Sequence, residues 1–309
     1  MIIDQFKKYP NGFYYFNKDE LKINYDNLFN AFSSKFEKFS IAYSFKTNYT
    51  PLLCKILKSK GAMAEVVSDM EMQLALRLGY SGDKIIFNGP FKSLSAIKYA
   101  LLNKVCIHID SLDELINICS IYDELEKKVS VNLGIRLNFP MEGEKRSRFG
   151  IDVESLEFQQ CVDIIKAKNF NLKGIHCHHP FRSLKSFHER VQKLCLCCKK
   201  IDLKFDYIDF GGGFYSPMPS SLATTLKINP PNYNDYANII FDAFQKNWLL
   251  DFVPEIIIEP GSALVANVFD LYTKVVSIKK IENMNIVTLS GSKFNILPNS
   301  SKKRRESRR

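Results

Sequence analysis

Short apolar segments rich in β-branched residues alternate along the chain with longer segments of helical periodicity. The apolar segments predict strands at 41–45, 63–67, 84–87, 105–109, 129–137, 172–177, 205–210 and 255–258. Helix-length stretches lie between most of them, as at 68–78, 112–121 and 184–199. Eight strands that alternate with helices is the number in a TIM barrel, so we expect an α/β fold of the (β/α)8 type.

The pattern changes after Leu264. Residues 269–278 and 285–289 have the alternation of strands, and no helical segment separates them. This is the pattern expected where a chain leaves a barrel and enters a small all-β domain.

Composition is that of an ordinary globular protein, with 46% hydrophobic and 25% charged residues. A length of 309 residues exceeds one average domain and accommodates a barrel with a small partner. The first ten residues include an acid, two lysines and a proline, and no apolar run approaches the length of a membrane-spanning helix. We therefore expect a cytoplasmic protein with no membrane partner.

The eight cysteines do not form a disulfide framework or a complete metal-binding pattern. Cys54, Cys106, Cys119 and Cys161 are scattered through apolar segments, where a free thiol behaves as a small core residue. Cys195 and Cys198 form one Cys-x-x-Cys downstream of His176 and His178, but no second pair exists. We expect reduced thiols and no metal site.

The formal net charge of +10 is concentrated at one end of the chain. Residues 302–309 carry six positive charges and one negative charge, which is half of the excess. We therefore expect a solvated, disordered basic tail over 299–309. The chain has no recognised nucleic-acid motif and no basic face interleaved with aromatic residues, so we expect no specific nucleic-acid partner.

Lys46 is the first candidate for chemistry, because it ends an apolar predicted strand. An ammonium group favours water, and a lysine kept at the end of a buried strand tends to have a lowered pKa. Such an amine is a nucleophile that can form a Schiff base with an aldehyde or a pyridoxal cofactor. The ordinary alternative is a lysine that extends its ammonium group to solvent.

Three later segments also place chemical groups at the ends of predicted strands. Gly211 to Gly213 follow the seventh strand, and successive glycines let backbone N–H groups surround a phosphate. Glu259 follows the eighth strand, and His176 and His178 alternate on the sixth, so that both imidazoles project from one face. The ordinary explanations are a tight turn, a capping carboxylate and satisfied core histidines.

The ordered set of these segments resembles the successive motifs of the alanine-racemase-fold, or fold-type III, pyridoxal-phosphate-dependent amino-acid decarboxylases. That family includes diaminopimelate, ornithine and arginine decarboxylases. The motifs are Tyr-Ser-Phe-Lys-Thr-Asn at 43–48, Gly-Ile-Arg-Leu-Asn at 134–138, Ser-Arg-Phe-Gly-Ile at 147–151, His-Cys-His at 176–178, Gly-Gly-Gly at 211–213 and Glu-Pro-Gly at 259–261. The resemblance extends from about residue 10 to about residue 298.

The resemblance implies that pyridoxal 5'-phosphate is the cofactor and that Lys46, His178 and Glu259 are the catalytic residues. Lys46 would hold the cofactor covalently, and His178 would stack on its ring. Glu259 would keep its pyridine nitrogen protonated, which strengthens the ring as an electron sink. A carboxylate in that role favours decarboxylation over racemisation.

By the same resemblance, further residues would complete the cofactor site. Gly211, Gly212 and Gly213 would bind the phosphate, with Gly261 and Ser262 beside the last strand. Glu65 would lie near the cofactor. Arg136 would belong to the same site and, together with His176, would orient its direct contacts.

Two departures from the family pattern concern the phosphate. Ser262 stands where the family usually has an arginine, and Pro180 and Phe181 replace a Gly-Ser pair. We therefore expect weaker phosphate binding, with Arg182 as a candidate to compensate.

The resemblance also gives the expected domain organisation. Residues 1–20 would contribute a strand to the β domain, 21–265 would form the cofactor-binding barrel, and 266–298 would be an incomplete C-terminal β domain. The family's Cys-Asp segment and its later tyrosine have no counterpart, since no cysteine follows Cys198. We therefore expect a C-terminally truncated chain that binds the cofactor but decarboxylates poorly.

The favoured interpretation is a pyridoxal-phosphate-dependent decarboxylase of a diaminopimelate-, ornithine- or lysine-like amino acid, with arginine and carboxynorspermidine also open. It would form a homodimer. Two alternatives stay open. One is a noncatalytic cofactor-binding relative that serves as a carrier or interaction protein, and the other is a polyanion-binding protein that depends on the basic tail.

Overall fold

The structure of the protein, a computed structural model, describes residues 2–143, 145–201 and 203–296. The chain divides into two compact units. One spans Asp19–Ala266, and the other joins Met1–Lys18 to the segment that begins at Asn267. The first unit contains the strands predicted for a barrel, and the second contains the strands predicted after it.

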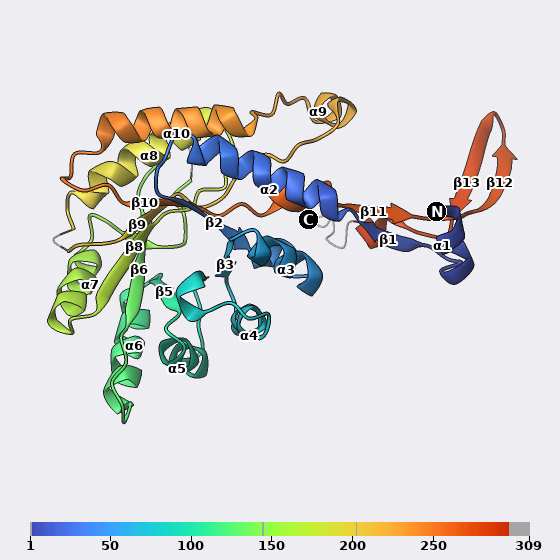
Figure 1. The fold of residues 1–309 in the computed structure, drawn as a ribbon. Helices are drawn as coiled ribbons and strands as arrows, with labels where there is room; N and C mark the ends of the chain where they lie inside the picture. Colours follow the sequence, from blue (N-terminus) through green and yellow to red (C-terminus); the bar gives the residue numbers. More distant parts are fainter. Residues whose placement is uncertain (1, 144, 202, 297–309) are drawn as a thin grey trace, which may run out of the picture. The chain divides into compact units, whose positions relative to one another are not determined.

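Eight parallel strands in the described part of the chain close into a ring (Figure 1). In order around the ring they are β5 (Cys106–Ile109), β4 (Ile85–Phe87), β3 (Met63–Val66), β2 (Phe39–Ser44), β10 (Glu255–Ile258), β9 (Tyr207–Asp209), β8 (Asn171–His176) and β6 (Asn132–Asn138). Pairing of β6 with β5 completes the ring. Each predicted strand overlaps one of these, so the predicted TIM barrel is confirmed. A short strand, β7 (Ile151–Asp152), pairs with β6 and lies outside the predicted strands.

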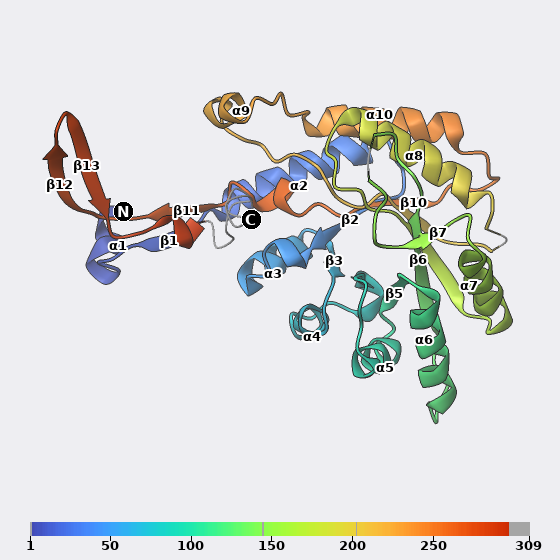
Figure 2. The ribbon, with the colours of Figure 1, turned by 180° about the vertical axis from the view of Figure 1, so that it is seen from behind.

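Helices cover the outside of the ring. They are α2 (Lys18–Ser33), α3 (Pro51–Ser59), α4 (Asp69–Arg77), α5 (Leu94–Leu102), α6 (Leu112–Glu124), α7 (Leu156–Ala167), α8 (Leu184–Cys198) and α10 (Tyr233–Asn247). A further short helix, α9 (Ser220–Leu226), buries none of its residues and does not cover the strands. A serine caps the N-terminus of α4, α5, α6, α7 and α8, and its side chain accepts a hydrogen bond from the amide three residues later. α8 and α10 run side by side along one side of the barrel, opposite α4, α5 and α6 (Figure 1, and from behind in Figure 2).

The inside of the barrel has an apolar layer and, toward the carboxyl ends of the strands, a polar one. Six strands contribute the apolar layer: Ala42, Met63, Ile86, Cys106, Tyr207 and Ile257. Because side chains alternate along a strand, the residue two positions later faces the same interior. Those later residues are all polar and all buried: Ser44, Glu65, Asn88, His108, Asp209 and Glu259. The fold therefore gathers six polar side chains at one end of the barrel.

Glycine on β8 makes room for an aromatic ring in this interior. A Cβ atom at Gly174 would lie 1.9 Å from Cε2 of Tyr207, which is closer than any packed atom allows. The Tyr207 hydroxyl lies 2.6 Å from Nε2 of His108 in a buried hydrogen bond. The missing side chain on one strand is therefore what lets a large polar ring occupy the centre of the barrel.

The second unit contains α1 (Ile2–Lys8), β1 (Phe13–Phe16), β11 (Phe269–Tyr272), β12 (Val275–Ile281), β13 (Met284–Leu289) and α12 (Lys293–Ile296). β1 pairs antiparallel with β11, and β12 pairs antiparallel with β13. The single strand predicted at 269–278 is therefore wrong, because this segment forms two strands with different partners. Alternation indicates an extended segment, but the partners decide where it is divided. The predicted tail at 299–309 lies outside the described residues.

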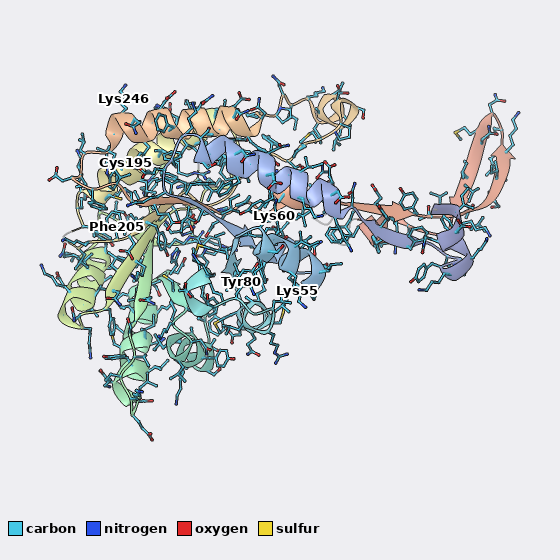
Figure 3. All side chains as sticks on the ribbon, viewed as in Figure 1. Lys55, Lys60, Tyr80, Cys195, Phe205 and Lys246 are labelled. Atoms are coloured by element: carbon cyan, nitrogen blue, oxygen red, sulfur yellow. The ribbon has the colours of Figure 1, made fainter. Side chains whose placement is uncertain are left out.

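Side chains pack the space between the strands and the helices (Figure 3). Cys195 on α8 and Phe205 before β9, both labelled in Figure 3, are buried. None of the eight cysteines, all of which lie in the described segments, forms a disulfide. No helix in these segments combines the length and apolar character needed to cross a membrane.

Candidate active site

Lys46 lies in the short 3-10 turn Phe45–Thr47 that follows β2, beside the polar layer of the barrel. Its Nζ is 3.3 Å from Oε1 and 3.2 Å from Oε2 of Glu65. Glu65 also accepts hydrogen bonds from Ser44 Oγ and, at 3.1 Å, from Asn88 Nδ2. The Lys46 side chain is 46% exposed while Glu65 is fully buried, so a buried carboxylate holds an amine that remains accessible.

The charges around Lys46 correct one expectation from the sequence. Burial by itself lowers the pKa of the amine, but the carboxylates of Glu65 and Glu259 and the hydrogen bond to Glu65 outweigh burial. The pKa of Lys46 is therefore raised above its ordinary value, and the expected lowering is wrong. An apolar strand before a lysine indicates desolvation, whereas only the fold shows which acidic residues from other strands face it.

Glu259 lies directly after β10 and is buried. Asn88 Nδ2 donates a hydrogen bond to its Oε1, and His176 Nε2 lies 3.3 Å from its Oε2. Asn88 therefore bridges the buried carboxylates of Glu65 and Glu259. This arrangement holds Glu259 in one orientation at the carboxyl end of the barrel.

Two histidines from the end of β8 flank this carboxylate layer. His176 is buried beside Glu259, and Nδ1 of His178 accepts a hydrogen bond of 3.1 Å from the Gly212 amide. Burial lowers the pKa of both imidazoles well below its ordinary value, and the charge of Arg136 lowers that of His176 further. Both rings are therefore neutral near pH 7, which lets His176 donate through Nε2 and His178 accept through Nδ1.

The glycine loop, Gly211 to Gly213, passes between the ends of β8 and β10. A Cβ atom at Gly211, whose φ is +68°, would lie 2.5 Å from the Cys177 carbonyl oxygen. A Cβ atom at Gly212 would lie 2.5 Å from the Glu259 carbonyl oxygen. Only residues without a side chain fit between these two strand ends.

Two of the three amides in the glycine loop already have acceptors. The Gly211 amide donates to Asp209 Oδ1 at 2.8 Å, and the Gly212 amide donates to His178 Nδ1. Within the described residues, the Gly213 amide has no acceptor. The loop therefore offers an anion fewer open N–H groups than three consecutive glycines suggest.

Asp209, His176 and Glu259 place three potential metal ligands within 4.8 Å of one another. Burial, and then the charge of Glu259, raise the pKa of Asp209 well above its ordinary value. A raised pKa favours the protonated form of Asp209, in which the repulsion between the two carboxyl groups is weaker.

A cavity of ≈ 510 Å³ opens beside Lys46. Its basic lining residues are Lys46, Arg136, Lys145, Arg146 and Arg148, and no acidic side chain of the described residues lines it. Neighbouring acids outside the cavity offset part of this charge. Arg136 Nη1 lies 3.5 Å from Asp110, and Arg146 Nη2 lies 2.6 Å from Asp152. The cavity remains positive and suits a ligand with anionic groups.

The Phe149 ring makes cation–π contacts with two of these arginines. The guanidinium carbons of Arg136 and Arg148 lie 4.8 Å and 4.6 Å from the centroid of this ring. These cation–π contacts attach the loop before β7 to the end of β6. Ser147, Arg148 and Phe149, the first three residues of the motif at 147–151, therefore line one side of the cavity.

The fold brings together most of the site residues predicted from the sequence. Lys46, Arg136 and His178 line the cavity, and Glu65 and Glu259 are buried next to them. The glycine loop touches His178 through the Gly212 amide.

Other predicted residues lie at the edge of this group. Gly261 packs against Thr47, since a Cβ atom there would lie 2.1 Å from Thr47 Oγ1. Ser262 begins the short helix α11 (Ser262–Val265) and does not line the cavity. The guanidinium group of Arg182 lies over the ring of Tyr215, with 5.4 Å between them, and also does not line the cavity.

The sequence interpretation misses Asn88 and the raised pKa of Asp209. Asn88 follows β4 as Glu259 follows β10, so its position at the end of a strand was an available signal. The pattern Phe-Asn-Gly-Pro at 87–90 is also typical of a turn, so the sequence alone does not distinguish a site residue from a turn residue at Asn88.

Comparison with known proteins agrees with this geometry. Residues 24–266 match the family "Pyridoxal-dependent decarboxylase, pyridoxal binding domain". The chain is 27% identical over 296 residues to the diaminopimelate decarboxylase of Methanocaldococcus jannaschii, which covers 90% of this chain and 66% of that protein. It is 30% identical over 297 residues to that of Helicobacter pylori strain J99, which covers 91% and 69%. The crystal structure of the M. jannaschii enzyme with L-lysine matches with a TM-score of 0.78 at 25% identity, covering 93% of this chain and 69% of that one.

The chain spans just under two thirds of the length of the M. jannaschii relative, at 66%. The family match begins within α2 and ends just after α11, so it covers the complete ring of strands. The chain therefore belongs to the family of pyridoxal-dependent decarboxylases and carries their pyridoxal-binding domain.

Proposed function

We propose that this protein is a pyridoxal-phosphate-dependent decarboxylase of diaminopimelate or a closely similar amino acid. The family supplies the cofactor. The observation that carries the proposal is the convergence of the accessible Lys46 amine, the buried Glu259 carboxylate and the glycine loop at one end of the barrel.

The residues at this end of the barrel fit pyridoxal phosphate. The Lys46 amine faces a cavity of ≈ 510 Å³, which accommodates a ligand of this size. Glu259, held by Asn88 and His176, is a buried anion suited to a pyridinium nitrogen. When bound, the cofactor supplies an electron sink for the negative charge left when carbon dioxide departs.

Each residue has one task in this proposal. Lys46 holds the cofactor covalently through Nζ, and Glu65 keeps that nitrogen beside the cavity. Glu259 keeps a proton on the ring nitrogen. His178 contributes an uncharged imidazole, because burial lowers its pKa. The Gly213 amide donates to the phosphate.

The charge of the cavity supports a substrate with two carboxylates. Arg136, Lys145, Arg146 and Arg148 attract anionic groups and repel a distal ammonium group. In diaminopimelate a second carboxylate compensates the distal ammonium group, whereas lysine and ornithine end in an ammonium group alone. The relatives from M. jannaschii and H. pylori are both diaminopimelate decarboxylases.

Carbon dioxide release from diaminopimelate, lysine, ornithine and arginine tests the proposal. We expect release from diaminopimelate to exceed release from the other three. Lys46→Ala is expected to abolish both turnover and the pyridoxyl adduct that borohydride traps, since the adduct forms at Nζ. Lys55→Ala is the matched control, because Lys55 is an exposed lysine on α3 (Figure 3) and is expected to change neither.

Several outcomes separate the parts of this proposal. A trapped adduct in the Lys46→Ala protein would remove Lys46 from its role. Faster release from lysine or ornithine would overturn the substrate assignment. Cofactor binding without carbon dioxide release from any amino acid would favour a noncatalytic carrier or interaction protein.

The homodimer implied by the resemblance belongs to the proposal, and light scattering of the purified protein measures it.

A further inference from the structure

Arg190 on α8 is fully buried, and its guanidinium group contacts two loops at the carboxyl end of the barrel. Nη1 donates to the carbonyl oxygens of Phe210 at 3.0 Å and Gly212 at 2.9 Å. Nη2 donates to those of His179 at 3.0 Å and Phe181 at 3.2 Å. One side chain therefore ties the glycine loop after β9 to the loop after β8.

The bond to Gly212 sets the direction of the next amide. In a trans peptide the C=O and the N–H point in opposite directions, and no peptide of the described residues is cis. With the Gly212 carbonyl turned toward Arg190, the Gly213 N–H turns away from the guanidinium group. Of the three glycine amides, this is the one without an acceptor within the described residues.

Arg190 also brings a permanent positive charge into a buried region. Burial, and then the charge of Arg190, lower the pKa of the neighbouring His179 to about 4. A positive charge behind an N–H group that points outward strengthens the attraction of that group for an anion, especially where water is excluded.

We propose that Arg190 is a positioning residue for the cofactor phosphate: it directs the Gly213 amide and supplies positive charge behind the glycine loop. This inference depends on the proposed function, in which the glycine loop binds phosphate. Arg190 does not contact the phosphate itself, because its Nη atoms bond to the backbone of the two loops. It supplies a cation that Ser262, the first residue of α11, does not provide.

Binding of pyridoxal phosphate and of pyridoxal, which lacks the phosphate, separates a phosphate role from a purely structural one. We expect the wild-type protein to prefer pyridoxal phosphate, and Arg190→Lys to reduce that preference about tenfold with little change in pyridoxal affinity. Lysine keeps the charge, but its single ammonium nitrogen cannot replace two Nη atoms that donate to four carbonyl groups. Fluorescence titration of both ligands measures the ratio without any turnover.

Lys92 provides the matched control, because it is another buried cation that bonds to backbone carbonyls at this end of the barrel. Its Nζ lies 2.8 Å from the Gly89 oxygen, 3.0 Å from the His108 oxygen and 2.8 Å from Glu114 Oε1. Lys92→Gln is expected to leave the ratio of the two affinities at the wild-type value. A reduced ratio in this control would make the effect a general result of losing a buried cation and would overturn the proposal.

Two further outcomes separate the role proposed for Arg190 from the proposed function of the protein. An unchanged ratio in Arg190→Lys, or an equal loss of affinity for both ligands, would leave Arg190 a structural residue and would overturn the inference alone. A wild-type protein that binds neither ligand would overturn the proposed function itself. Because Arg190→Lys keeps a cation and an apolar stem in the same pocket, the test does not depend on the folding of a charge-removed variant.

Discussion

Among single residues, Asn88 decides how two buried carboxylates share one end of the barrel. Its Nδ2 donates to Glu65 Oε1 at 3.1 Å and also to Glu259 Oε1. Two buried anions repel each other, and removing either from water is costly. The Asn88 amide and the Lys46 ammonium group together offset part of that cost.

The raised pKa of Lys46 gives a prediction for Glu65. Glu65→Gln keeps a side chain of the same size beside Ser44 and Asn88 but removes the charge that stabilises the ammonium form. Because the neutral amine is the nucleophile, we expect capture of pyridoxal phosphate near neutral pH to become at least about threefold faster. Borohydride trapping across neutral and alkaline pH measures the rate.

Glu114→Gln is the control for this change, since Glu114 is a carboxylate of the same barrel end that pairs with Lys92 at 2.8 Å instead. Its pH dependence of cofactor capture is expected to equal that of the wild-type protein. The explanation fails if Glu65→Gln captures the cofactor no faster, or if Glu114→Gln is accelerated equally.

Among the elements, β8 contributes to the packing of the barrel through a glycine, which leaves space for an aromatic ring from the neighbouring strand. Gly174 on β8 pairs with Tyr207 on β9, and the Tyr207 ring occupies the volume that a β8 side chain would need. We expect Gly174→Ala to lower the free energy of unfolding by about 1 to 3 kcal/mol, because an overpacked core forces strain on its neighbours. Urea denaturation followed by circular dichroism measures the loss.

A second background tests whether the Tyr207 ring is the cause. In a Tyr207→Leu protein the same alanine at position 174 meets a smaller side chain and is expected to cost clearly less. An equal cost of Gly174→Ala in both backgrounds would show that backbone strain, and not the contact with the ring, explains the effect.

For the whole molecule, the buried histidines predict a loss of stability in mild acid. Burial lowers the pKa of His108, His176 and His178 well below its ordinary value, and that of His179 to about 4. Between about pH 6.5 and pH 4 the unfolded chain therefore binds more protons than the folded one, so stability falls as the pH falls. His179 alone accounts for a loss on the order of 2 kcal/mol at about pH 5.

The raised pKa values of Asp209 and Glu71 act in the opposite direction, but these are two carboxyl groups against four histidines. Urea denaturation at neutral pH and at mildly acidic pH measures the net effect. His179→Gln is expected to reduce the pH dependence, because it removes one of the four groups. Stability that is constant or rises between neutral pH and pH 5 would contradict this account.

The sequence by itself determined the barrel and the candidates for most residues of the proposed site. Periodicity depends on neighbours along the chain, so eight strands could be predicted from local patterns. The motifs containing Lys46, His178, Glu259 and the glycine loop also follow strand ends, and parallel strands of a barrel bring their carboxyl ends together. A strand pattern fails where pairing partners decide the element, as in the division of 269–278 into β11 and β12 and in the short strand β7.

Only the tertiary structure decided the electrostatics of the site and the direction of its backbone. The raised pKa of Lys46 depends on Glu65 and Glu259, which come from two other strands. The acceptors of the Gly211 and Gly212 amides, and the four carbonyl groups around Arg190, likewise join loops and a helix that are separate in sequence. Charge interactions and hydrogen bonds depend on distances of a few ångströms between such segments, and local sequence patterns do not contain those distances.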